Sequence, residues 1–184
     1  MIKTIKKTIK PSSSSKKENS HLYPGKEPDI VERSHTKEFQ GDVLNMLYWL
    51  DLKTPRVKAN FSDFDFIKVA HHGITKGSVD SLASHLGISR KSLAEDIFNV
   101  SVKTLERKDV NTKLDKKTSS HALEIARVVQ HAYEVLRDKD RVKLWVNREN
   151  KALNNLKPVQ LFDTLTGLNM VNDILGRIEE GVYS

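Results

Sequence analysis

The sequence predicts an all-α protein in which a helix-turn-helix unit is followed by a small helical C-terminal domain and preceded by a flexible basic N-terminal arm. Three observations support this fold class. Apolar residues recur at helical spacing in several segments from residue 37 onwards. Three short segments between residues 78 and 108 each begin at a serine, which favours a helix N-terminus. The first 20 residues hold six lysines and one glutamate and little that could be buried.

The length of 184 residues corresponds to one or two small domains. We expect four parts: a flexible basic arm (1–36), an N-terminal helix and linker (37–60), a helix-turn-helix DNA-binding and dimerisation domain (61–140) and a C-terminal domain (141–184). The chain has no cysteine, which excludes disulfide scaffolds and thiolate metal sites. No apolar run approaches the roughly 20 residues of a membrane span. No apolar core follows the N-terminal lysines, so we expect no secretory signal. We therefore expect a cytoplasmic protein.

The formal net charge of +7 is concentrated at the start of the chain. Residues 1–20 contribute six lysines and one glutamate, which is +5 of the total. Such an arm can add sequence-independent affinity for phosphates, or it can act as a solubilising tail, and composition favours the tail.

The first predicted helix spans residues 37–52. Its apolar stripe consists of Phe39, Val43, Met46, Leu47 and Leu50. Pro55 prevents its continuation. We expect this helix to pack on the folded body, and a dimerisation helix is the alternative.

Residues 61–76 fit either a helix or a short strand. The spacing of Phe61, Phe64, Ile67 and Ala70 fits a helix that starts near Ser62. The prediction is a helix that ends at Gly73.

A helix-turn-helix pattern follows. We expect three short helices that open at Ser78, Ser89 and Ser101, with breaks at Gly87 and Asn99. The helix from Ser101 is the predicted recognition helix, and the helix before it supports it. Asn99 stands where the turn usually has glycine, and it tolerates the left-handed conformation. The supporting helix is also one residue longer than usual between Ala94 and this turn.

DNA contact is expected from the start of both helices, because a groove-reading helix presents its N-terminal residues to base edges and phosphates. The predicted DNA-binding residues are Arg90, Lys91, Ser101, Lys103, Thr104, Arg107 and Lys108. Glu106 and Asp109 dilute the positive charge. A helix-turn-helix kept only as a packing scaffold is the alternative.

A polar loop over residues 110–118 leads to a long amphipathic helix, which we expect to begin at Ser119 or Ser120. Its main face carries Leu123, Ala126, Val129, Tyr133 and Leu136, and further apolar residues widen it so that it buries on both sides. A short helix from Asp140 to about Asn147 then carries Leu144 and Trp145 into the C-terminal domain.

The last 44 residues contain two more predicted helices. The first opens at Pro158, whose fixed φ suits a first helical turn. The second spans residues 166–180, with Leu168, Val171, Leu175 and Ile178 on one face. Gly181 ends it. A segment this short must pack on the preceding helices or on a partner, and Trp145 should anchor that packing.

This segment also carries a specific motif, W…N-x-A-L…P-x-x-L-x-D-T-x-x-G-x-x-x-V-x-x-x-L-G-R-I-E-x-G-V-Y. It resembles the toxin-binding domain of Xre/MbcA/ParS-type antitoxins. The matching residues are Trp145, Asn150, Ala152, Leu153, Pro158, Leu161, Asp163, Gly167, Val171, Leu175, Gly176, Arg177, Ile178, Glu179, Gly181, Val182 and Tyr183. One departure is Lys157, where the family usually has Thr or Ser as a helix cap; its loss would cost about 1 kcal/mol.

The resemblance implies a type II antitoxin of the Xre kind whose partner is a RES-domain toxin that consumes NAD or transfers ADP-ribose from it. The C-terminal domain would cover the active site of the toxin, and the N-terminal half would bind operator DNA as a homodimer and autoregulate the operon. The expected toxin contacts are Trp145, Asn150, Leu153, Arg177, Glu179, Gly181, Val182, Tyr183 and Ser184. Neither a cofactor nor a small-molecule substrate is implied.

Two other function classes compete with this one. A stand-alone helix-turn-helix regulator without a toxin is the alternative. An enzyme is disfavoured, because no nucleophile–base pair, phosphate-binding glycine loop or metal-ligand spacing can be found. His121 and His131 fall on one helical side but without a carboxylate at ligand spacing. Arg177 and Glu179 could also form a surface ion pair worth less than about 1 kcal/mol.

Overall fold

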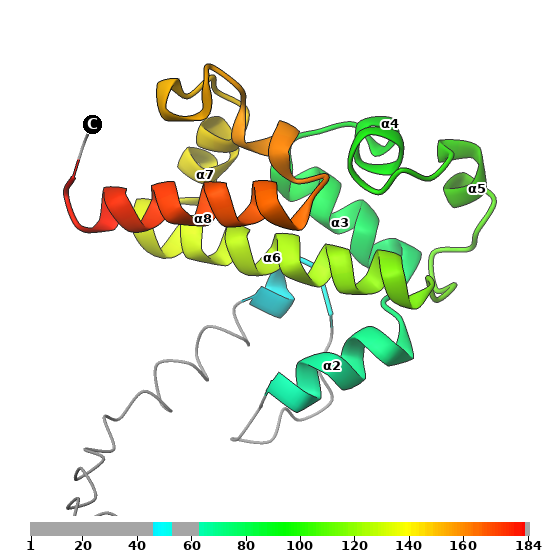
Figure 1. Ribbon diagram of the computed structural model, residues 1–184. Coiled ribbons are helices and arrows are strands. Elements are labelled where there is room, and N and C mark those ends of the chain that lie inside the picture. Colours follow the sequence, from blue (N-terminus) through cyan, green and yellow to red (C-terminus); the bar gives the residue numbers. More distant parts are fainter. Residues whose placement is uncertain (1–45, 53–62, 183–184) are drawn as a thin grey trace, which may run out of the picture. The chain divides into compact units, whose positions relative to one another are not determined.

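The computed structural model describes residues 46–52 and 63–182, and this part of the chain is helical, without a strand (Figure 1). The elements are α2 (Asp63–His72), α3 (Lys76–Leu86), α4 (Arg90–Ser92), the π-helix η1 (Leu93–Ile97), α5 (Val102–Glu106), α6 (Lys116–Leu136), α7 (Lys139–Val146), the 3-10 helices η2 (Lys151–Leu153) and η3 (Pro158–Leu161), and α8 (Leu165–Glu179). The predicted all-α class is confirmed. The predicted arm at residues 1–36 lies outside the described residues, and the predicted division into domains stays a prediction.

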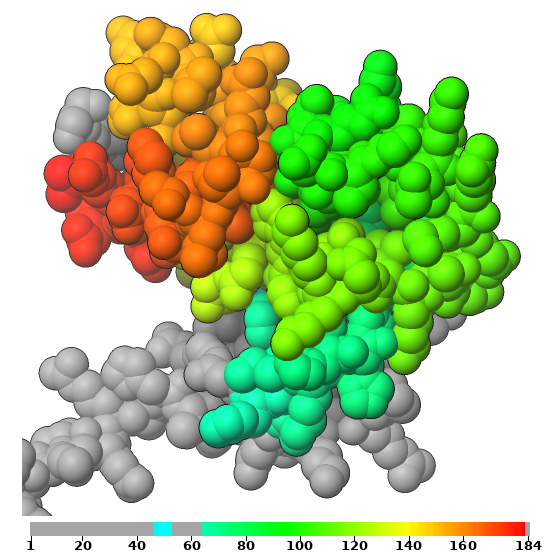
Figure 2. Space-filling model, turned by 45° about the vertical axis from the view of Figure 1, so that its right-hand side comes forward, coloured from blue at the N-terminus to red at the C-terminus, as the bar shows by residue number. Residues whose placement is uncertain are grey.

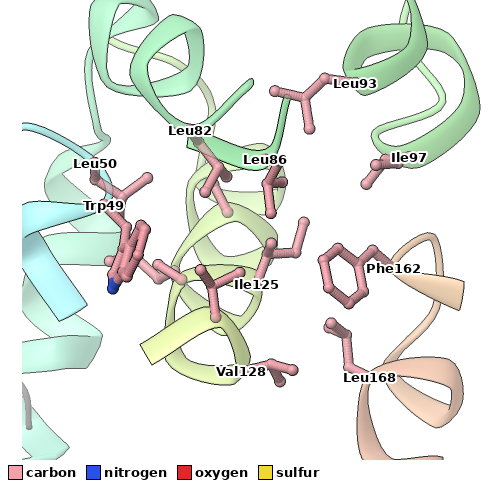
Figure 3. Close-up of a cluster of buried hydrophobic side chains, with 14 of the residues drawn as sticks. Trp49, Leu50, Leu82, Leu86, Leu93, Ile97, Ile125, Val128, Phe162 and Leu168 are labelled. Carbon is pink, nitrogen blue, oxygen red and sulfur yellow. The ribbon is translucent and has the colours of Figure 1, made fainter. Parts of the chain in front are cut away.

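Helix α6 is the element against which four of the other described helices pack. It contacts α2, α3, α7 and α8. Ile125 and Val128 of α6 lie between apolar side chains of α3 and those of the C-terminal segment (Figure 3). The prediction that this helix buries a wide face is therefore confirmed, and one hydrophobic core extends from residue 46 to residue 175.

The end of the helix predicted at 37–52 packs on this body. Met46, Leu47 and Leu50 of its stripe are buried, as predicted, whereas Phe39 and Val43 lie outside the described residues. Trp49 is also buried, and its indole N–H donates to the side-chain oxygen of Gln130 at 2.8 Å. This bond satisfies two polar groups that would otherwise be costly in the core.

Helix α2 confirms the prediction of a helix over the alternative of a strand. It ends at Gly73, which has φ +76°, a value that only glycine adopts readily. A Cβ at this position would also lie 2.5 Å from the carbonyl oxygen of Leu114. Both observations explain why glycine stands where the chain leaves α2.

The prediction that Ser78 opens the next helix is wrong. The N-cap of helix α3 lies three residues earlier, at Thr75, whose side chain accepts the backbone N–H of Ser78 at 3.2 Å. Ser78 itself is buried in the first turn, with its hydroxyl 3.0 Å from that of Thr75.

The predicted start of α6 at Ser119 or Ser120 is also wrong. Asp115 is the N-cap, and its carboxylate accepts the backbone N–H of Thr118 at 3.0 Å. The Ser119 hydroxyl is used elsewhere, since it accepts the backbone N–H of Ile74 at 3.1 Å. That contact links the start of α6 to the segment between α2 and α3.

The C-terminal elements lie close to their predicted positions. The structure has α7 at Lys139–Val146, a 3-10 helix that opens at Pro158, and α8 at Leu165–Glu179, which ends before Gly181 with φ +72°. The predicted apolar face of α8 is confirmed, because Leu168, Val171 and Leu175 are buried and Ile178 is partly buried.

Candidate functional site

Helix α8 is joined to its preceding turn by close packing at its first turn. The Thr164 side chain caps the helix by accepting the backbone N–H of Gly167 at 3.0 Å. A Cβ at Gly167 would overlap the carbonyl group of Leu161. Gly167 is therefore required by the packing of η3 against α8, which fixes where α8 points.

Two histidines of α6 hold the C-terminal segment along that helix. The His121 Nε2 lies 2.6 Å from the Phe162 carbonyl oxygen, and the His131 Nδ1 lies 2.7 Å from Asn172 Oδ1. Both pairs are separated by 41 residues, so α6 and α8 run in the same direction, side by side, as Figure 1 shows. The prediction that the two histidines share one helical side is confirmed; a bridging role between α6 and the C-terminal segment was not foreseen.

The opposite side of α8 is exposed, and we call it the outer face. It consists of Thr166, Asn169, Met170, Asp173, Arg177 and Glu180. Met170 is 44% exposed, and Val182, just beyond the helix, is 53% exposed. Met and Arg are among the residue types enriched in protein interfaces. The outer face thus offers apolar and charged groups that α8 does not use for its own packing.

The predicted contact residues before α8 have internal roles. Leu153 is buried, and Trp145 is half-buried against the core. Asn150 organises the loop, because its side chain accepts the backbone N–H of Ala152 at 2.9 Å. Leu144, which the short helix was expected to carry into the C-terminal domain with Trp145, is instead 70% exposed. The first three residues therefore support the C-terminal segment from within.

The predicted contact residues at the end of the chain differ from these. Gly181 and Val182 are exposed, while Tyr183 and Ser184 lie outside the described residues. Arg177 is exposed and forms no ion pair with any described residue. Glu179 lies 3.5 Å from His131 Nε2. Arg177 and Glu179 thus do not pair with each other.

The helix-turn-helix region contains a three-residue turn (87–89) and a four-residue turn (98–101), and each includes a residue in the left-handed conformation. Gly87, with φ +67°, follows α3, and Asn99, with φ +54°, follows η1. The predicted left-handed Asn99 is confirmed. The extra residue before it is accommodated by a π-helical turn, in which the Phe98 N–H donates to the Leu93 carbonyl five residues back at 3.0 Å.

The predicted DNA-binding residues lie on α4, on α5 and directly beside the two ends of α5. Those with exposed side chains are Arg90, Lys91, Ser101, Lys103, Thr104 and Arg107, and Lys108 is half-buried. Ser101 occupies the N-cap position of α5 but makes no capping bond there; instead the Glu95 carboxylate accepts the Val102 N–H at 3.5 Å. Lys91 lies 4.0 Å from the same carboxylate. Arg90 pairs with Asp80 of α3, a contact that the sequence did not suggest.

The C-terminal segment touches the turn after α3. The Asn147 side chain donates to the Leu86 carbonyl at 2.7 Å and so caps the end of α3, and the Lys143 side chain covers Gly87 so closely that a Cβ there would overlap it. A groove of about 410 Å³ lies beside this contact, lined by Ile88, Ser92, Asp96, Ile97, Asn147, Lys157, Val159 and Gln160. Figure 2 shows the bordering surfaces in green and orange.

In the described part of the chain, two titratable groups have shifted pKa values. Burial, and then the positive charge of Lys139, lower the pKa of His85 against the opposing effect of Asp51. The His85 ring packs against Tyr48 and Trp49, with centroids 5.1 and 5.3 Å away. The backbone N–H of Thr118 is the main reason that the pKa of Asp115 is lowered. Both groups stabilise the fold and lie apart from the outer face of α8.

Within the described ranges, no group of three or more His, Cys, Asp or Glu side chains could hold a metal ion. In the same part of the chain, none of the helices combines the length and the hydropathy that a membrane crossing requires.

Comparison with known proteins points to one family. Residues 131–181 match the antitoxin Xre/MbcA/ParS C-terminal toxin-binding domain. The chain is also similar to a protein of Photorhabdus laumondii subsp. laumondii described as antitoxin Xre, with 33% identity over 67 residues. That stretch covers 36% of this chain and 45% of the relative, so it spans less than half the length of the relative.

Proposed function

We propose, from the match of residues 131–181 to the Xre/MbcA/ParS toxin-binding domain, that the chain is the antitoxin of a type II toxin–antitoxin pair whose toxin carries a RES domain. In this proposal the C-terminal segment covers the NAD-binding active site of the toxin. The chain acts by steric exclusion and not as an enzyme.

The exposure of the outer face of α8 and of Val182 is the observation that carries this proposal. The buried side of α8 is filled by the chain's own core, whereas Met170, Arg177 and Val182 remain exposed. Trp145, Asn150 and Leu153 then contribute indirectly, because they hold the loop that precedes α8. Tyr183 is an aromatic anchor in this proposal, since such side chains concentrate binding energy at interfaces.

The test is to produce the chain together with a RES-domain protein encoded beside it and to follow NAD. We expect the two proteins to copurify and the chain to prevent NAD loss. Met170→Asp combined with Arg177→Glu should weaken the complex. Ile67→Asp is the matched control, because Ile67 is 49% exposed on α2, outside the matched domain. Full NAD consumption at saturating wild-type chain would contradict the proposal.

The second part of the proposal is autoregulation by DNA binding. A homodimer would place two copies of the helix-turn-helix region on half-sites about 34 Å apart. The helix predicted to read the groove is α5, with Lys103, Thr104 and Arg107 exposed. The other candidate is the pair of helices α3 and α4–η1, which the Gly87 turn joins. A three-residue turn that contains glycine is typical of the helix-turn-helix motif.

Mobility-shift titrations on DNA from upstream of its own gene separate these candidates. If α5 reads the groove, Lys103→Ala with Arg107→Ala should weaken binding most. If α4 is the helix at the DNA instead, Arg90→Ala with Lys91→Ala should weaken it most. Unchanged binding in both double variants would exclude DNA contact at these helices and favour a packing scaffold.

A stand-alone regulator without a toxin is the alternative, and the identity of the neighbouring gene separates the two. A RES-domain neighbour supports the antitoxin, while DNA binding without any copurifying toxin supports the regulator.

A further inference from the structure

A buried carboxylate between two cations joins the two helices on either side of the Gly87 turn. Asp80 Oδ2 lies 2.6 Å from Lys76 Nζ, and Asp80 Oδ1 lies 3.1 Å from Arg90 Nε. Lys76 and Asp80 belong to α3, and Arg90 is the first residue of α4. The side chains of Lys76 and Asp80 are only 13% and 14% exposed, whereas that of Arg90 is 61% exposed. The cluster is therefore anchored in the protein and ends in a solvent-exposed guanidinium.

The charges in this cluster do not cancel. Two cations share one carboxylate, so a net charge of +1 remains, and it resides on the exposed side at Arg90. Asp80 Oδ1 has no hydrogen-bond partner in the described part of the chain, so its contact with Arg90 Nε is ionic and not a well-aligned hydrogen bond. Within that same part, the two terminal amino groups of Arg90 make no hydrogen bond.

We propose that Asp80, supported by Lys76, is a positioning residue that holds the Arg90 guanidinium ready to bind a phosphate of the DNA backbone. A guanidinium that is held at Nε still has its two terminal amino groups, which bind two oxygens of a phosphate in a planar fork. Contacts of this kind set the register of a protein on the duplex without reading sequence. This inference rests on the DNA-binding part of the proposed function.

The direction in which Asp80→Asn changes the DNA affinity distinguishes this positioning role from a purely structural one. Asp80→Asn removes a negative charge near the proposed DNA site, so electrostatics alone predicts stronger binding. If Asp80 positions Arg90, binding must weaken instead, as it does in Arg90→Ala. The loss of one phosphate contact is worth roughly eightfold in Kd at 0.1 M salt and lowers the slope of log K against log salt concentration by about 0.9.

The experiment measures Kd by fluorescence anisotropy for the full chain on two labelled duplexes, one from upstream of its own gene and one of random sequence and equal length. Arg90→Ala and the double variant should weaken binding to both duplexes by the same factor, because Asp80 acts through Arg90. Asp80→Asn should also weaken binding, by no more than that factor, because the guanidinium keeps its charge but loses its anchor. Glu124→Gln is the control, since this carboxylate pairs with Arg127 on α6. It should not weaken binding.

Equal or tighter binding by Asp80→Asn overturns the inference while the DNA-binding proposal stands. Failure of the wild-type chain to bind either duplex overturns both. If Asp80→Asn does not fold because Lys76 is left buried without a counter-ion, Lys76→Met with Asp80→Asn removes both buried charges and gives the same comparison.

Discussion

At the scale of single residues, two glycines of α8 occupy opposite environments. A Cβ at Gly167 would overlap the Leu161 carbonyl, whereas a Cβ at Gly176 would have no described atom within 4 Å. Both positions belong to the motif shared with the antitoxin domains. The fold therefore explains the first glycine but not the second.

This contrast predicts opposite effects on stability. Gly167→Ala should lower the free energy of unfolding by roughly 1–3 kcal/mol or more, because the added methyl group must displace the backbone of η3. Gly176→Ala should raise it by about 0.5–1 kcal/mol, because alanine loses less entropy in a helix. Urea denaturation of both variants measures the difference, and equal destabilisation would contradict the described packing.

His85 gives the second prediction at this scale, a dependence of stability on pH. Its pKa is lowered in the folded state from the ordinary value of 6.5, mainly by burial. Between the folded pKa and 6.5, the unfolded chain therefore binds more protons at this histidine than the folded chain does. The contribution of His85 to the free energy of unfolding is fully present above about pH 6.5 and falls as the pH drops towards the folded pKa. His85→Phe keeps an aromatic ring beside Tyr48 and Trp49 and removes this contribution. Urea unfolding between pH 7.5 and 5.5 should show a smaller loss in the variant; identical losses would exclude His85 as a source.

At the scale of elements, the start of α6 depends on one carboxylate. Asp115→Ala removes the N-cap and should cost about 1 kcal/mol, whereas Ser120→Ala should change stability by less than about 0.5 kcal/mol. The pKa of Asp115 is lowered, so its contribution is present above its ordinary value of 3.8 and is lost as the pH falls below it. Thermal melts of both variants at pH 7 test the assignment. A larger loss for Ser120→Ala would restore the start predicted from the sequence.

The same helix shows what the sequence could and could not reveal. Apolar spacing predicted α6 and α8, because the residues that recur every three or four positions are the ones buried or partly buried. It also predicted α2 as a helix but not its buried face, since Phe64 and Ile67 are exposed and only Ala70 of the described predicted face is buried. The starts of α3 and α6 were misplaced because several capping residues stand close together, and the choice between Asp115 and Ser119 is made by a distant group, the Ile74 N–H. Burial also depends on packing between distant segments, so the motif alone could not show that Leu153 is buried and Arg177 is exposed.

At the scale of the whole molecule, the described part of the chain combines both proposed activities on one core. Helix α6 packs on α3 and on α8, and Asn147 of the C-terminal segment caps α3. The Asp80–Arg90 contact was also beyond sequence reasoning, since it requires the geometry of the Gly87 turn. The proposed toxin-binding and DNA-binding surfaces are therefore built on the same helices, and a change that unfolds one should unfold the other.

The tail after α8 is where function can be separated from this shared stability. Val182 is exposed and contributes to the fold mainly through its backbone N–H, which donates to the Arg177 carbonyl at 2.9 Å. Val182→Asp with Tyr183→Ala keeps that bond, and truncation after Glu180 removes it together with the bond from the Gly181 N–H to the Ile178 carbonyl. Both should leave the melting temperature within a few degrees of wild type, because a lost exposed bond is worth only about 1 kcal/mol. Both should also release the NAD-consuming activity that we propose for the toxin, measured against Ile67→Asp. Full inhibition by the truncated chain would show that the outer face of α8 alone covers the toxin and would remove the tail from the mechanism.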